Sequence, residues 1–119
     1  MPRVLVVDDD SWQAEHLVEQ LVAAGYEAEA TLHAPQAIAN IDSSMPDCVV
    51  LDIGLPGVNG MALLHELRSH TDLAKVPVVV CTNVAVELDE LRPYGVKAVL
   101  QKAGINHGDI VAAVRRVGL

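Results

Sequence analysis

Short aliphatic runs alternate with helix-like segments along this chain, and that alternation limits the possible folds more than any other feature. Four of the runs are continuously apolar and rich in β-branched residues, which is typical of parallel strands covered on both faces. They span 4–7, 48–51, 78–81 and 98–100. A weaker fifth strand is predicted at 26–30. The segments between and after the runs predict helices at 11–24, 35–42, 60–69, 85–92 and 107–117.

Local signals support these helices. Gly25 marks the end of the first, Pro35 suits the first turn of the second, and Asn106 with Asp109 forms a plausible capping pair for the last. Strand and helix alternate five times, and right-handed crossovers convert that order into an open parallel sheet with helices on both faces. We therefore expect a single doubly wound (βα)₅ α/β domain over residues 1–119.

Composition excludes several classes of protein. No apolar run approaches the roughly 20 residues of a membrane span, and charge interrupts the N-terminal run too early for a signal peptide. We expect a cytoplasmic protein without membrane contact. The net charge of −8 argues against nucleic-acid binding by this domain. Cys48 and Cys81 lie in apolar runs, so buried reduced thiols are expected, and the five histidines show no metal-ligand spacing.

Polar residues stand where the predicted strands end. In an open parallel sheet, functional sites lie outside the carboxyl ends of the strands. All predicted strands except the second bring reactive or charged groups to that edge. These residues are Asp8, Asp9 and Asp10 after the first strand, Asp52 after the third, Thr82 and Asn83 after the fourth, and Gln101 and Lys102 after the fifth.

This set of groups suits phosphoryl chemistry. Carboxylates packed together raise one another's pKa, and a divalent cation such as Mg²⁺ relieves that conflict. One carboxylate can then attack phosphorus and form an acyl phosphate, with a lysine and a hydroxyl near the phosphoryl oxygens. Singly, each residue has a simpler interpretation: Asp10 as a helix N-cap, Thr82 as another, Lys102 as a surface lysine. Their joint occurrence at four strand ends favours the site.

The motifs resemble those of the receiver domains of two-component response regulators, over essentially the whole chain. VLVVDDD at 4–10 is similar to the family's first strand and acidic pair. LDIGLPGVNG at 51–60 is similar to its phosphoacceptor strand and loop, PVVVCT at 77–82 to its fourth strand, and AVLQK at 98–102 to its fifth. The resemblance implies a flavodoxin-like fold with strand order 2-1-3-4-5.

The resemblance also implies roles. Asp52 would be the phosphoacceptor, with Mg²⁺ (or Mn²⁺ as a substitute) held by Asp8, Asp9, Asp52 and the backbone carbonyl of Gly54. Lys102 would pair with an acceptor oxygen and then with the phosphoryl group. Thr82 would be the hydroxyl that moves to the phosphoryl oxygen on activation.

Four departures from the family pattern matter. Ala103 replaces the usual proline after the lysine, which predicts a trans peptide bond and an altered following loop. Val99 stands at the switch-aromatic position, so coupling to the surface would run through Thr82 and loop movement. Asn83 is larger than usual and would narrow access to Asp52, bind the phosphoryl group or cap the fourth helix. Neither Gly54 nor Val84 can orient an attacking water, which predicts a long-lived phosphoryl group.

The expected function is that of a phosphoacceptor in a two-component system or phosphorelay, a self-catalysed acceptor and not a turnover enzyme. Its donor would be a sensor histidine kinase or phosphotransfer protein, and its reader a protein target or fused output domain. The opening MPRVLVV favours a natural N-terminus, in a stand-alone regulator or a receiver cut from a longer chain. The alternative is a degenerate receiver that acts only as an interaction module. An aspartyl phosphatase is disfavoured because Asp52-Ile53-Gly54 lacks a second acid.

Overall fold

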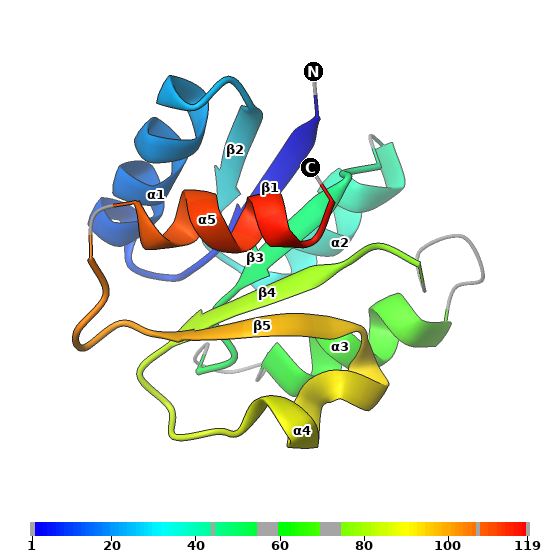
Figure 1. The fold of residues 1–119 in the computed structure, drawn as a ribbon. Helices are drawn as coiled ribbons and strands as arrows, with labels where there is room; N and C mark the ends of the chain where they lie inside the picture. The colour runs from blue at the N-terminus through cyan, green and yellow to red at the C-terminus, as the bar shows by residue number, and fades with distance from the viewer. Residues whose placement is uncertain (1, 44, 55–59, 70–74, 107, 119) are drawn as a thin grey trace.

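The computed structural model describes residues 2–43, 45–54, 60–69, 75–106 and 108–118. Strands and helices alternate along it as predicted (Figure 1). In chain order the elements are β1 (Arg3–Val7), α1 (Ser11–Ala23), β2 (Glu27–Thr31), α2 (Ala34–Ser43), β3 (Cys48–Leu51), α3 (Gly60–Ser69), β4 (Val78–Thr82), α4 (Leu88–Leu91), the 3₁₀ turn η1 (Arg92–Tyr94), β5 (Val96–Gln101) and α5 (Asp109–Arg116).

The five strands form one parallel sheet in the order β2-β1-β3-β4-β5, which confirms the predicted topology. The order reverses at β1, so the first two crossovers place their helices on opposite faces of the sheet. Helices α1 and α5 cover one face, while α2, α3 and α4 cover the other (Figure 1). Among the residues that the structure describes, no helix is both long and apolar enough to cross a membrane.

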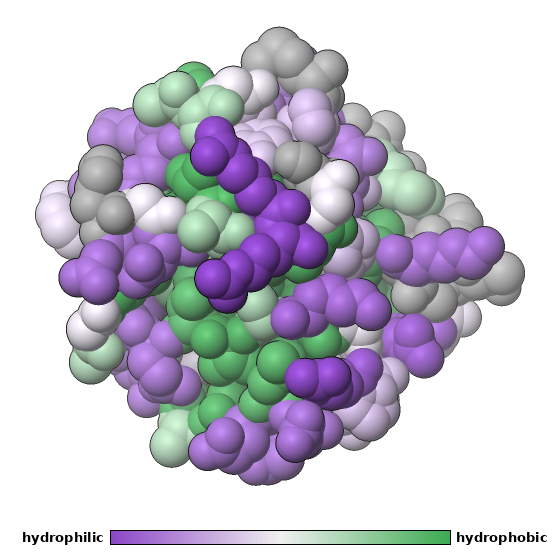
Figure 2. Space-filling model, viewed as in Figure 1, coloured by the Kyte–Doolittle hydropathy of each residue, from purple (hydrophilic) through white to green (hydrophobic). Residues whose placement is uncertain are grey.

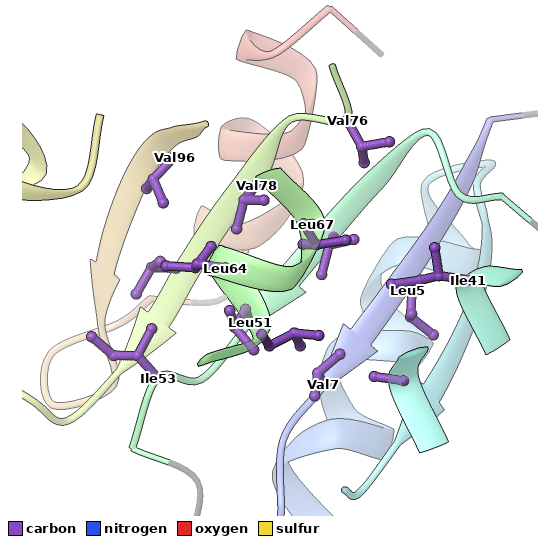
Figure 3. Close-up of a cluster of buried hydrophobic side chains, with 14 of the residues drawn as sticks. Leu5, Val7, Ile41, Leu51, Ile53, Leu64, Leu67, Val76, Val78 and Val96 are labelled. Carbon is purple, nitrogen blue, oxygen red and sulfur yellow. The ribbon is translucent and has the colours of Figure 1, made fainter. Parts of the chain in front are cut away.

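Each face of the sheet has its own apolar core, built from aliphatic side chains because the chain has no phenylalanine. On the face covered by α2 and α3, Leu5 and Leu51 of the sheet and Leu64 of α3 are fully buried (Figure 3). Under α1 and α5, Leu17 and Ile110 pack against the other face of the same strands. Successive strand residues point to opposite faces, and this is why the central strands read as unbroken apolar runs.

Two elements differ from the sequence prediction. The fifth strand begins at Val96, not at 98, and most of its side chains are only half-buried because it is the edge of the sheet. The predicted helix at 85–92 is confined to Leu88–Leu91 and continues as η1. The remaining helices and strands lie within about two residues of their predicted bounds.

The predicted helix ends are confirmed in most details. Gly25 follows α1 with a φ of 99°, a left-handed conformation that glycine adopts without strain. Asp10 caps α1, because its side chain accepts the Gln13 N–H at 3.2 Å. At α5 the Asp109 carboxylate accepts the Asn106 N–H at 2.8 Å, but the N-cap residue is Gly108 and makes no side-chain cap bond.

Candidate functional site

The carboxyl ends of four strands bring the candidate side chains to one edge of the sheet. Backbone bonds extend the sheet one residue beyond the strands and align these ends. The N–H of Asp52 donates to the Val7 carbonyl at 2.9 Å, and the N–H of Lys102 donates to the Thr82 carbonyl at 2.9 Å. The second strand contributes backbone only, since the Asp8 N–H donates to the carbonyl of Thr31 at 3.1 Å.

Asp52 lies at the centre of the site with both carboxylate oxygens bonded. Its Oδ1 accepts the Thr82 hydroxyl at 2.7 Å and the Gly54 N–H at 2.9 Å. Its Oδ2 accepts from the Lys102 ammonium at 2.8 Å. Asp52 is only 7% exposed, so these three donors replace the water that its charge would otherwise require.

Lys102 bridges two carboxylates. Its Nζ lies 2.8 Å from Asp52 Oδ2 and 2.8 Å from Asp8 Oδ2. Asp8 is almost fully buried, and its Oδ1 accepts the Asp10 N–H at 3.0 Å. One cation therefore neutralises charge on two acids that come from different strands.

The donor set fits a hard divalent cation. One carboxylate oxygen each from Asp8, Asp9 and Asp52 lies within 4.8 Å of the others, and Asp9 is exposed to solvent. Three carboxylates and the Lys102 ammonium sum to a charge of −2, which a divalent cation would cancel. Oxygen ligands with an open, solvated side suit Mg²⁺, which retains several waters when bound.

The pKa values of the two buried acids, Asp52 and Asp8, are shifted in opposite directions. Burial alone would raise the pKa of Asp52, but hydrogen bonds from Lys102, Thr82 and Gly54 outweigh it and lower the pKa. For Asp8 burial prevails over the bond to Lys102 and the pKa is raised. The pKa of Lys102 is raised because its bonds to both carboxylates exceed the effect of its burial. Asp52 is thus held as an anion, the form that can act as a nucleophile.

The family described as response regulator receiver domain matches residues 4–115. The chain belongs to this family. Among curated relatives, the transcriptional regulatory protein BaeR of Escherichia coli is 33% identical over 90 residues, covering 76% of this chain and 36% of BaeR. The phosphate regulon transcriptional regulatory protein PhoB of Rhizobium meliloti is 29% identical over 92 residues, covering 77% of this chain and 40% of PhoB. The receiver thus spans well under half of either relative.

Solved structures share the receiver fold. The chemotaxis response regulator CheY4 of Vibrio cholerae superposes with a TM-score of 0.88 at 24% identity, over 98% of each chain. The signal receiver domain of a histidine kinase from Syntrophus aciditrophicus gives 0.84 at 27% identity, over 98% of this chain and 89% of that one. The acidic triad is typical of the Mg²⁺ site of receivers, which are signalling modules and not turnover enzymes.

Thr82 and Asn83 do not cap the fourth helix of this receiver. Helix α4 begins at Leu88 with Glu87 as its N-cap, so the capping alternatives for both residues are wrong. The Thr82 hydroxyl is fully buried and already donates to Asp52, while it accepts the Val84 N–H at 3.2 Å. Asn83 is exposed beside the site, and its predicted contact with a phosphoryl group remains a prediction.

The other departures lie around β5. The peptide bond before Ala103 is trans, as predicted. Val99 packs only partly into the core and lines a hollow of about 640 Å³ between β5 and the segment from Ala85 to Glu90. The Gly54 N–H faces Asp52, and metal binding by the Gly54 carbonyl remains a prediction. The motif positions 55–59 lie outside the described residues.

The Gln101 side chain makes a contact that the sequence did not predict. The Gln101 side chain donates from Nε2 to the Val84 carbonyl at 3.2 Å and so joins the end of β5 to the segment after β4. The sequence placed Gln101 at a strand end but gave no signal for its partner, because a glutamine at an exposed edge is usually solvated.

Proposed function

We propose that this receiver accepts a phosphoryl group on Asp52 from a phosphohistidine on a sensor kinase or phosphotransfer protein. The observation that carries the proposal is the bonding of Asp52: a buried carboxylate with a lowered pKa, held by Thr82 and Lys102 beside two further acids. We propose that residues 1–119 act as one such domain. Asp8, Asp9, Asp52 and the Gly54 carbonyl would hold Mg²⁺, or Mn²⁺ in its place.

In the transfer, an Asp52 carboxylate oxygen forms the new bond to phosphorus as the bond from phosphorus to the histidine nitrogen breaks. The nitrogen keeps the electron pair. Charge spreads over the phosphoryl oxygens during this step, so positioned cations and donors lower the barrier. Lys102 and the Thr82 hydroxyl are the donors this chain supplies, and bound Mg²⁺ would contribute further positive charge.

Phosphorylation replaces one carboxylate charge by a more negative group with more acceptor oxygens. Thr82 and Lys102 would then change partners from Asp52 to the phosphoryl group, and β4 and β5 carry that change to the surface. The α4–β5–α5 face lies nearest these strands, and an apolar area runs over β5 between the polar helices (Figure 2). A protein target or fused output domain would read this face, without nucleic-acid contact by the receiver itself.

Trp12 supplies a docking point for the phosphoryl donor. It is 71% exposed on the first turn of α1, two residues beyond the acidic loop, and stacks on His16 with a ring separation of 5.5 Å. We propose that this exposed ring contacts a phosphohistidine protein close to the acidic loop, a contact that a small acyl phosphate would not use. Replacing Trp12 by Ala should slow transfer from a phosphohistidine protein and leave transfer from a small acyl phosphate unchanged.

The decisive test uses acetyl phosphate with Mg²⁺, followed by intact mass. A gain of one phosphoryl group that is absent in Asp52→Asn supports the proposal. Asp89→Asn is the matched control, because the same chemical change is made on an exposed side chain that pairs with the exposed Arg92. If the folded wild-type protein gains no mass and does not bind beryllofluoride in Mg²⁺, the chain is instead a degenerate interaction module.

A further inference from the structure

A continuous series of hydrogen bonds runs from Asp52 to the outer edge of the sheet. The Thr82 hydroxyl donates to Asp52, and the same oxygen accepts the Val84 N–H. The carbonyl of Val84 in turn accepts from the Gln101 amide. Gln101 is exposed and lines the hollow between β5 and the segment that leads into α4. Thr82 and Val84 thus connect Asp52 with the surface side chain of Gln101.

The side chain of Val84 lies beside Gly54, the residue whose N–H donates to Asp52. A Cβ placed on Gly54 would be 3.1 Å from Val84 Cγ2, 3.3 Å from Asp52 Oδ1 and 3.8 Å from the Thr82 hydroxyl oxygen. These three atoms therefore surround one point beside the carboxylate. The nearest of them is a methyl carbon of Val84, although the residue as a whole is 42% exposed.

The segment that carries Val84 begins with exposed residues and packs against the core at Val86 and Leu88. Asn83, Val84 and Ala85 are exposed, and the helix that follows is only four residues long. Val84 itself is bonded through its N–H to Thr82 and through its carbonyl to Gln101. Val99 offers no polar group to this segment. The Gln101 amide is accordingly the side-chain tie from β5 to the residue that covers the acceptor.

We propose that Gln101 is a positioning residue that keeps Val84 beside Asp52 and thereby sets the lifetime of the phosphoryl group. The lifetime part rests on the proposed function. In the loss reaction, a water oxygen bonds to phosphorus and the bond from phosphorus to Asp52 breaks. The Asp52 carboxylate leaves with the electron pair, and the proton of the water goes to the released phosphate. A methyl group held over the acceptor reduces the access of that water.

The first experiment needs no phosphorylation. Gln101→Glu keeps the size of the side chain but loses the donor at neutral pH. Hydrogen exchange of the Val84 amide, followed by NMR in the unphosphorylated protein, should become up to about tenfold faster. Loss of one neutral hydrogen bond changes the equilibrium for local opening by up to roughly this factor. Lys97→Gln is the control, since Lys97 is exposed on the same strand. Unchanged Val84 exchange in a folded Gln101→Glu protein would overturn the positioning role.

The second experiment measures loss of the phosphoryl group by intact mass after acetyl phosphate is removed. We expect the rate constant to rise by about threefold to tenfold in Gln101→Glu and in Val84→Ala, and to stay at the wild-type value in Lys97→Gln. Equal lifetimes in all four proteins would overturn the proposal while leaving Asp52 as the acceptor. A wild type that gains no phosphoryl group defeats the proposed function instead, and Val84 exchange then decides the role of Gln101.

Discussion

Lys102→Met is the substitution that most directly tests how the acidic cluster is held together. The lysine ammonium makes two contacts of 2.8 Å, one to Asp8 and one to Asp52, and its side chain is 14% exposed. Methionine keeps much of the length and apolar stem of the lysine but removes the charge. The formal charge of Asp8, Asp9, Asp52 and residue 102 together then changes from −2 to −3.

The size of the effect follows from these contacts. At an effective dielectric constant of about 20, each ion pair contributes roughly 4 kcal/mol of attraction, so two pairs contribute about 8 kcal/mol. Taking the ammonium out of water costs several kcal/mol, which leaves a net loss of about 3–5 kcal/mol when one partner of such a buried pair is removed. We expect the free energy of unfolding of Lys102→Met to fall by that amount at pH 7 without Mg²⁺.

Urea unfolding, followed by circular dichroism with and without Mg²⁺, measures this loss. The more negative cluster of the variant should bind Mg²⁺ more tightly, so Mg²⁺ should stabilise Lys102→Met more than the wild type. Lys97→Met is the matched control, because it removes an exposed lysine from β5, the strand that leads to Lys102, and should change stability by less than about 0.5 kcal/mol. If Lys102→Met unfolds at the wild-type urea concentration without Mg²⁺, the bridging role of Lys102 is refuted.

Three further predictions concern other parts of the molecule. Leu64→Ala removes most of a fully buried side chain on α3 and should lower the free energy of unfolding, measured in urea, by about 2–5 kcal/mol. Burial raises the pKa of Cys81 to about 11 and of Cys48 to about 12, so alkylation at pH 8, counted by mass, should require unfolding. The lowered pKa of Asp52 stabilises the fold at pH values above 3.8, the ordinary pKa of the group, and this stabilisation is lost as the pH falls below 3.8. The raised pKa of Asp8 has the opposite effect, because it lowers stability as the pH rises above 3.8. The free energy of unfolding, measured against pH, should lose the first dependence in Asp52→Asn and the second in Asp8→Asn.

The sequence predicted the strands and helices most accurately where burial on both faces requires apolar residues. β3 and β4 are covered on both faces, so every position except the terminal Thr82 is apolar and the strand bounds are visible in the sequence to within one residue. β5 is an edge strand with the exposed Lys97 near its start. Because this charged residue interrupts the apolar run, the predicted strand began two residues too late. Helix α4 buries little more than Leu91, so its neighbours carry no helical pattern and the predicted helix was too long.

The site was predictable in its members and less so in its bonding. The residue types at the strand ends identified Asp52, Thr82 and Lys102, because parallel strands bring those ends together. The sequence could not show that Lys102 is shared with Asp8, since that depends on a side-chain path of a few ångströms. It also did not show that the Thr82 hydroxyl already bonds Asp52 before any phosphorylation, which reduces the movement expected of that residue.

If the proposed function holds, the position of Gln101 next to Lys102 would give this receiver, which has Val99 at the switch-aromatic position, a route from the site to its surface. Lys102 holds Asp52, while Gln101, its neighbour in the chain, holds the Val84 carbonyl. The Lys102 N–H is also bonded to the carbonyl of Thr82, so β4 and β5 are joined between these two contacts. Under the proposed function, a phosphoryl group that draws Lys102 and Thr82 toward itself would displace Gln101 or break its bond to Val84. Either result alters the hollow between β5 and α4, where an aromatic side chain would otherwise report the change.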